Sequence, residues 1–288
     1  MRVAVTGATG TIGRAVVRVL RDRGDDVVAV SRNPASAGMD AIGWDGLDLS
    51  GFDGVIHLAG SPIDQRWTDE GKKKIRDSRI DGTRKLVEAL RAADPRPRVL
   101  VSQSAEGYYQ RGSQPVPEES PPGSGFLSDV VQAWEAEARK AEELGVRVVL
   151  PRTGVVLSKE GGALPKMLTP FKLGVGGPVA GGAQPFPWVD VRDAAEALVF
   201  LLDNDAASGP VNLVSPEEHT NKTFTNVLGR VIRRPTLFPV PSFAIKILYG
   251  EMGSTVTQGS NPDPTKLQQL GYTFKQANLE NALRSQLD

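Results

Sequence analysis

The sequence predicts an α/β fold in which a doubly wound parallel sheet carries a smaller, mostly helical C-terminal lobe. Short apolar runs alternate with amphipathic stretches of helical length through the first half of the chain, which is typical of parallel sheets covered on both faces. Beyond about residue 216 the pattern is helical with proline-rich joints, which predicts the lobe. The 288-residue length suffices for one large domain with a smaller partner.

The composition excludes several classes of protein. Because 34 basic residues balance 34 acidic ones, neither nucleic acid nor a membrane is expected as a partner. The absence of cysteine excludes a disulfide framework and a cysteine nucleophile, and two distant histidines make a metal site unexpected. No apolar run has the length of a membrane span, and the first residues have the pattern of a strand rather than a leader. The expected compartment is therefore the cytoplasm.

The first strand, helix and second strand form one unit. Residues 3–5 are a short apolar run, which predicts a buried strand that enters a tight loop at residues 6–7. A helix follows and ends near Gly24, and residues 27–30 predict the second strand, with a right-handed crossover between them. The helix is predicted from apolar residues at helical spacing, at Ile12, Ala15, Val16, Val19 and Leu20.

The alternation continues to about residue 215. Further strands are predicted at 55–60, 99–102, 146–150 and 211–214, and helices at 68–91, 128–144 and 190–202. The stretch 161–187 is rich in glycine and proline and predicts irregular or cleft-forming structure. These boundaries divide the chain into a sheet domain, residues 1–153 and about 186–215, and a smaller lobe, about 154–185 and 216–288.

The loop after the first strand is the sharpest motif. Gly7, Gly10 and Gly13 form a GxxGxxG between a strand and a helix. The first glycine allows the tight turn, the second lets backbone N–H groups approach a pyrophosphate, and the third lets the helix pack closely on the sheet. The pyrophosphate would then lie at the positive end of the helix dipole. The sequence therefore predicts a Rossmann-type dinucleotide site.

The end of the second strand indicates which dinucleotide is bound. Enzymes that use NAD usually carry an acid there for the ribose 2′-hydroxyl, whereas this chain has Ser31 and Arg32. A guanidinium can form a planar fork on a 2′-phosphate, and a serine hydroxyl can donate to it. NADP(H) is therefore the expected cofactor, and Arg14 is a second candidate for the same phosphate.

Together these motifs resemble the extended short-chain dehydrogenases/reductases. The similar segments are TGATGTIG at 6–13, HLAG at 57–60, SRIDGTRKLVEAL at 78–90, RTGVVL at 152–157 and WVDVRD at 188–193. More closely, SRNP, GYY, KMLTPFKLGVGGP and LGYTF resemble the atypical branch of "epimerase family proteins", which is also called NAD-dependent epimerase/dehydratase-like or cell-division-inhibitor-like. The resemblance spans nearly the whole chain.

The resemblance implies a set of cofactor contacts. Arg79 stands where ordinary extended members carry an asparagine, so it is expected to reach the cofactor, with a helix-surface ion pair as the alternative. Val156 matches a position near the nicotinamide. The other matching positions are the phosphate loop (Gly7, Thr9, Gly10, Thr11, Ile12 and Gly13), the 2′-phosphate site (Ser31 and Arg32) and the strand end that flanks the adenine ribose (Leu58, Ala59 and Gly60).

The family's proton-transfer pair is missing. The family works through a Tyr-x-x-x-Lys on one helix, and those positions are Leu127 and Val131 here. Ser104 matches the serine that orients the carbonyl, and Tyr108 or Tyr109 is the candidate replacement for the tyrosine, with aromatic packing as the alternative for both. Candidates that equally fit caps or surface charges are Glu106, Asp129 and Asp190, and His57 fits a packed residue better than a base.

The sequence thus predicts an NADP(H)-binding protein similar to the short-chain dehydrogenases/reductases. The leading expectation is an oxidoreductase or epimerase that acts on a small carbonyl or sugar-nucleotide substrate. The alternative is a non-catalytic NADP-binding regulatory or interaction protein, because Leu127 and Val131 cannot move a proton. The expected partner is a small molecule, and a homodimer is one option for assembly.

Overall fold

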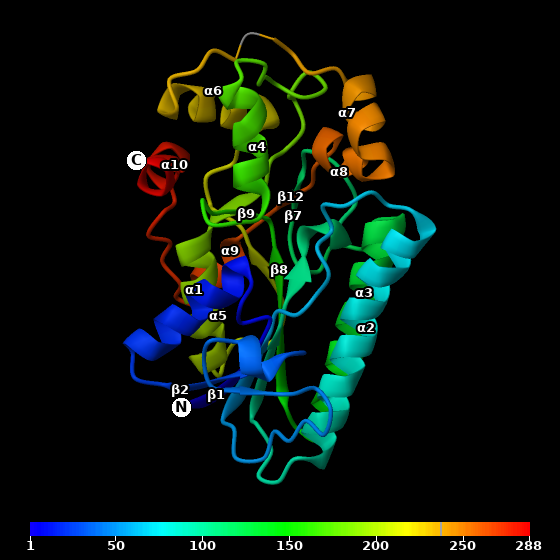
Figure 1. The fold of residues 1–288 in the computed structure, drawn as a ribbon, viewed down its shortest axis with the longest axis vertical. Helices are drawn as coiled ribbons and strands as arrows, with labels where there is room; N and C mark the ends of the chain where they lie inside the picture. Colours follow the sequence, from blue (N-terminus) through cyan, green and yellow to red (C-terminus); the bar gives the residue numbers. More distant parts are fainter. Residues whose placement is uncertain (237) are drawn as a thin grey trace.

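A parallel sheet occupies the centre of the molecule (Figure 1), as seen in a computed structural model that describes residues 1–236 and 238–288. The strand order is β11-β8-β5-β4-β1-β2-β3, and short β6 also pairs with β8. The strands are β1 (Arg2–Thr6), β2 (Asp26–Val30), β3 (Ala41–Ile42), β4 (Gly54–His57), β5 (Val99–Ser102), β6 (Ser104–Ala105), β8 (Arg147–Thr153) and β11 (Gly209–Leu213).

The strand order reverses at β1, which places the ligand crevice. The chain runs outward from β1 through β2 to β3, then returns to the other side of β1 with β4 and continues to β11. In open α/β sheets, ligands bind outside the carboxyl ends of the strands at such a reversal. The loops that follow β1 and β4 therefore lie where a sheet of this kind is expected to bind a ligand.

Helices cover both faces of the sheet. The helices α1 (Thr11–Asp22) and α5 (Val191–Asp203) pack together on one face, and α2 (Asp69–Ala92) and α3 (Phe126–Arg139) pack together on the other (Figure 1). Val3 and Val5 of β1 belong to the core beneath α1 and α5, whereas Ala4 belongs to the core beneath α2. This alternation explains why the strands are apolar on both faces.

A third core lies beyond the carboxyl ends of the strands. It joins the parallel pair β9 (Val155–Leu157) and β10 (Trp188–Asp190) to helices from the chain's second half. Those helices are α4 (Ala163–Lys172), α6 (Asn221–Val231) and α10 (Leu279–Leu287). The division of the chain into two domains stays a prediction.

The remaining elements are short. The strands β7 (Pro115–Val116) and β12 (Asn261–Pro262) form a second small parallel pair. No helix in the described part of the chain combines the length and apolarity that crossing a bilayer requires. The other helices are α7 (Ser242–Tyr249), α8 (Ser254–Thr257) and α9 (Thr265–Gln269), and the 3₁₀ turns are η1 (Pro34–Ser36), η2 (Glu106–Tyr108), η3 (Glu142–Leu144) and η4 (Gly250–Gly253).

The structure confirms the predicted α/β fold and corrects one segment. The stretch 161–187 is not irregular throughout, because residues 163–172 form the helix α4. Leu164, Leu168 and Phe171 recur at helical spacing and are buried in the third core. The burial of this apolar face outweighs the backbone hydrogen bond that Pro170 removes inside the helix.

Candidate functional site

The glycines of the phosphate loop are required by close backbone packing. Gly7 has a φ of +68°, and a Cβ there would lie 2.9 Å from the carbonyl of Leu58. At Gly13 a Cβ would overlap the carbonyl oxygen of Gly7 and lie 2.8 Å from the Cα of Ala8. The loop therefore lies directly against both the end of β4 and its own helix, as a dinucleotide loop requires.

The N-terminus of α1 is prepared for an anion. Its N-cap, Gly10, offers no side-chain acceptor, and the first turn contains no acidic residue. By contrast, the Thr68 hydroxyl accepts from the Gly71 N–H at the start of α2, where Asp69 and Glu70 occupy the first turn. The uncapped N–H groups of α1 and its helix dipole thus remain available to a phosphate.

A buried polar clamp holds the loop to the neighbouring strand. The Thr6 hydroxyl accepts hydrogen bonds from the N–H groups of Leu58 and Ala59, both at 3.0 Å. It also lies 2.7 Å from Nδ1 of His57, whose Nε2 lies 3.0 Å from the Thr83 hydroxyl. Thr6 was not among the residues expected at the site. The sequence alone does not distinguish Thr6 from any other threonine at the end of a strand.

His57, which belongs to this buried group, should make the stability of the protein depend on pH. Burial lowers the pKa of His57 to about 4. Because the unfolded histidine titrates near 6.5, the unfolded chain binds a proton between those values and the folded chain does not. Stability should therefore fall by about 3 kcal/mol as the pH drops from 6.5 to 4 through this residue.

Urea unfolding of the wild type and His57→Gln across that pH range measures the effect. Carboxylates also lose their charge in this range, so the informative quantity is the difference between the two proteins. The His57→Gln variant should show the shallower loss of stability. Equal pH slopes in the two proteins would mean that this histidine does not resist protonation.

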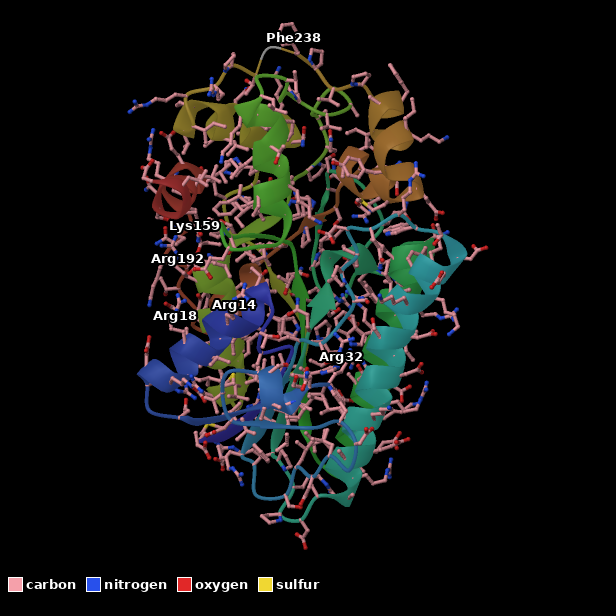
Figure 2. The ribbon with its side chains drawn as sticks, in the orientation of Figure 1. Arg14, Arg18, Arg32, Lys159, Arg192 and Phe238 are labelled. Atoms are coloured by element: carbon pink, nitrogen blue, oxygen red, sulfur yellow. The ribbon has the colours of Figure 1, made fainter. Side chains whose placement is uncertain are left out.

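The predicted 2′-phosphate residues lie at the end of β2. Ser31 accepts a hydrogen bond from the N–H of Asn33 at 3.2 Å. Arg32 is exposed and forms no ion pair within the described part of the chain. Arg14 instead donates to the carbonyl of Thr9 at 2.8 Å, inside the phosphate loop (Figure 2). Arg32 is therefore more available to bind a phosphate than Arg14, whose guanidinium already has a hydrogen-bond partner.

Arg79 approaches the crevice from α2. Its guanidinium donates to the carbonyls of Ser61 and Ile75 at 3.0 and 3.1 Å, and a Cβ on Gly60 would lie 3.2 Å from it. It also lies 5.2 Å from the centre of the Trp134 ring. Burial lowers the pKa of Arg79 to about 10. No carboxylate pairs with it in the described residues, so the surface ion pair considered as the alternative does not form.

Ser104 and Tyr109 belong to one buried polar network. The Ser104 hydroxyl donates to Glu135 at 2.6 Å, and Glu135 receives two hydrogen bonds from Arg152, both at 2.8 Å. Arg152 also donates to the Tyr109 hydroxyl, which in turn donates to Asn212 at 2.6 Å. Every hydroxyl in this network already has a partner. Such full satisfaction favours a structural role for both residues.

The two neighbouring tyrosines lie in different environments. Tyr109 is only 2% exposed, and burial raises its pKa to about 12, against the opposing effect of Arg152. Tyr108 is half-buried, and its ring stacks on the Arg152 guanidinium at 3.4 Å, while its hydroxyl has no hydrogen-bond partner in the described residues. Of the two candidates, only Tyr108 combines a free hydroxyl with access to solvent.

Leu127 and Val131, which stand at the helix positions of the missing Tyr-Lys pair, pack against Gly107. Gly107 lies against Leu127 and Val131, since a Cβ on the glycine would come within 3.5 and 4.0 Å of these side chains. Two proposed acids are also engaged: Asp190 caps α5 through the Arg192 N–H, and Glu106 accepts from Arg111. These contacts favour structural roles for both carboxylates.

The segment after β9 lies against the start of α1, next to the phosphate loop. Val156 lies in β9, immediately beyond the end of β8, and is half-buried. Four residues past that strand, a Cβ on Gly161 would come 2.5 Å from the Thr11 hydroxyl oxygen. Gly161 was missed as a site residue, although the Gly161-Gly162 pair could have indicated a close approach. In the described part of the chain, no group of three or more histidine or carboxylate side chains could hold a metal ion.

A family model described as "NAD dependent epimerase/dehydratase family" matches residues 3–214, and a domain of unknown function matches residues 240–286. An epimerase family protein of Staphylococcus aureus is 35% identical over 290 residues, which cover 97% of this chain and 96% of that protein. A chloroplastic SDR39U1 homolog of Arabidopsis thaliana is 38% identical over 300 residues, which cover 99% of this chain and 86% of that one.

A solved structure is similar over the full length. The crystal structure of human epimerase family protein SDR39U1 with NADPH has a TM-score of 0.93 and 34% sequence identity to this chain. The match covers 99% of both chains. The similarity therefore includes the segments beyond the sheet as well as the sheet itself.

Proposed function

The chain belongs to the NAD dependent epimerase/dehydratase family, and from this membership we propose that it binds NADP(H) and acts as an oxidoreductase or epimerase. The proposed substrate is a small carbonyl compound or a sugar nucleotide, bound beyond the carboxyl ends of the strands. A cytoplasmic setting is part of the proposal, in keeping with a chain that contains no cysteine.

The observation that carries cofactor binding is the uncapped N-terminus of α1, whose first turn contains no acidic residue and which follows a loop with no room for side chains. The human relative crystallised with NADPH supports the choice of the phosphorylated dinucleotide. In this chain Arg32 is the residue proposed to bind the 2′-phosphate. Arg79 supplies a second positive charge beside Gly60, on the β4 side of the crevice.

The chemistry follows from what each residue offers. When bound, NADP(H) supplies or accepts a hydride at C4 of its nicotinamide. The backbone of the loop holds the pyrophosphate, and Thr6 keeps the β1 and β4 loops together. Tyr108 is proposed to hold the proton at the substrate oxygen. Its hydroxyl, unlike that of Tyr109, has no hydrogen-bond partner in the described residues, and its ring lies on the guanidinium of Arg152.

Cofactor preference is tested by titration of the purified protein with NADPH, NADP⁺, NADH and NAD⁺. Replacing Arg32 by alanine should weaken NADPH binding about 10- to 100-fold, because a charge-assisted pair with phosphate is lost. Binding of NADH should change little. Arg18→Ala, on the exposed side of α1 (Figure 2), is the matched control and should leave both affinities unchanged.

Failure of the wild-type protein to bind any of the four nucleotides would refute the proposal. A preference of the wild type for NADH would refute the choice of NADP(H) and the assignment of Arg32, and would leave the binding of a dinucleotide intact. The second candidate function is NADP-dependent regulation without turnover, which is favoured by Leu127 and Val131 at the family's catalytic positions. It predicts tight NADPH binding with no oxidation of NADPH by any member of a carbonyl panel.

A further inference from the structure

Two parts of this electrically neutral chain contain basic residues but no acidic ones. Residues 161–189 and 219–250 contain seven lysines and arginines and no aspartate or glutamate. Elsewhere acidic residues therefore exceed basic ones, which is why the total of 34 against 34 conceals the imbalance. A net charge near zero says nothing about a local field of this kind.

The fold brings the two segments together at one end of the molecule. The N–H of Ala180 donates to the carbonyl of Val240, and the N–H of Val240 donates to the carbonyl of Pro178, both at 2.9 Å. The N–H of Val179 donates to the Asn221 side chain at 2.8 Å. In Figure 1 the helices of these segments, α4, α6 and α7, lie in the upper part of the molecule.

This end also exposes large apolar side chains. We call it the tip and define it as residues 172–178 together with 233–236 and 238–247. Figure 2 labels Phe238 at its apex. The exposed apolar side chains are Leu173 (73%), Val175 (58%), Phe238 (64%), Phe243 (66%) and Ile247 (68%). They account for five of the seven large hydrophobic side chains found exposed among the described residues.

Four cations accompany these apolar groups. They are exposed and form no ion pair in the described residues, in contrast to Lys166, which pairs with Asp64, and Arg230, which pairs with Glu280. Within α7, Ile245 is buried while Phe243, Lys246 and Ile247 face outward. The four free cations of the tip are Lys172, Arg233, Arg234 and Lys246.

We propose that the tip binds the surface of an anionic lipid bilayer. Clustered exposed apolar side chains mark a binding surface, and here they would enter the boundary between headgroups and acyl chains. Each lysine or arginine near an anionic surface adds to the attraction, so four cations reinforce the apolar contact. The combination of the two side-chain types at one end of the molecule matches an interfacial anchor.

The positive charge of the tip makes a second copy of the chain an unfavourable binding partner. A two-fold symmetric interface places the same patch on both partners, so Lys172, Lys246 and the two arginines would face their own counterparts. With no acidic residue in either segment, nothing in the tip would compensate this repulsion. A lipid surface supplies the missing negative charge. The proposal departs from the expectation of no membrane partner, which rested on net charge alone.

The test is co-sedimentation of the full-length protein with vesicles. One vesicle preparation contains phosphatidylcholine alone, and the other contains phosphatidylcholine with phosphatidylglycerol. The wild type should sediment with the anionic vesicles and not with the neutral ones, and salt should weaken the binding. Both Lys172→Glu/Lys246→Glu and Phe243→Ser/Ile247→Ser should lower vesicle affinity by at least about tenfold.

Lys85→Glu, at an exposed position on α2, is the control for a charge reversal elsewhere and should bind as the wild type does. Because the replaced side chains are exposed, the variants should keep the wild-type unfolding transition and NADPH affinity, so their folding can be checked independently. Absence of wild-type binding to anionic vesicles overturns the proposal. Equal binding by the wild type and both tip variants also overturns it. A tip variant that alters the size of the protein in solution but not its vesicle binding assigns the tip to self-association instead.

Discussion

Replacing Tyr108 with phenylalanine should lower kcat by about 10²- to 10⁴-fold, the usual contribution of a positioned proton donor. The reason is that its hydroxyl is the unpartnered one of the GYY pair, while its ring keeps the Arg152 guanidinium in place. Phenylalanine preserves the ring contact and removes only the hydroxyl. The measurement is the steady-state rate of NADPH oxidation with a substrate found in a carbonyl panel, beside an NADPH titration that should give an unchanged Kd.

Tyr109→Phe is the matched control. It removes a hydroxyl from the buried network, so it should cost stability and leave kcat within about threefold of the wild type, as expected for a group that no substrate contacts. A reversed result, with turnover lost in Tyr109→Phe and retained in Tyr108→Phe, would mean that the buried network opens during catalysis. Unchanged turnover in both variants would remove both tyrosines from the mechanism.

Replacing Glu135 with alanine should destabilise the protein by about 3–5 kcal/mol, the range for breaking a buried ion pair. Arg152 is only 2% exposed and would lose both of its carboxylate hydrogen bonds, and Ser104 would lose its acceptor. Burial by itself would lower the pKa of Arg152, but its hydrogen bonds to Glu135 outweigh this effect and raise it. Removing Glu135 would take this raising effect away, but the ordinary pKa of an arginine is so far above neutral that the guanidinium still stays charged.

Urea unfolding measures this loss. The control is Glu142→Ala, whose side chain is 47% exposed and lies 3.5 Å from Arg139. An exposed pair of this kind contributes about 0–1 kcal/mol. If Glu135→Ala and Glu142→Ala lowered the free energy of unfolding equally, the buried network would contribute no more to stability than an exposed ion pair does.

The strand, loop and helix at the start of the chain were predictable because they depend on neighbours in the sequence. The order of apolar runs around Gly7, Gly10 and Gly13 is a local pattern, and the structure places strand, loop and helix where that pattern predicts them. The boundaries were less predictable. The strand predicted at 146–150 extends to Thr153, because its last residues are held by pairing with β11 and β6, far away in the chain.

The roles of the polar residues could not be predicted in the same way. Whether a tyrosine hydroxyl is free depends on which groups the fold places around it, and Asn212 is 103 residues away from Tyr109. The same holds for Ser104, whose acceptor Glu135 is on another element. Sequence spacing identified both as candidates, but only the packed structure distinguishes them from Tyr108.

The sequence by itself determined the α/β fold and the family, because periodicity and short motifs report contacts made within a few residues. Tertiary structure alone decided which hydroxyl stays free and that two distant segments without acids meet in one cationic, apolar tip. The physical reason is that burial, hydrogen-bond satisfaction and the local electric field are sums over neighbours in space. Those neighbours come from parts of the chain that no local pattern connects.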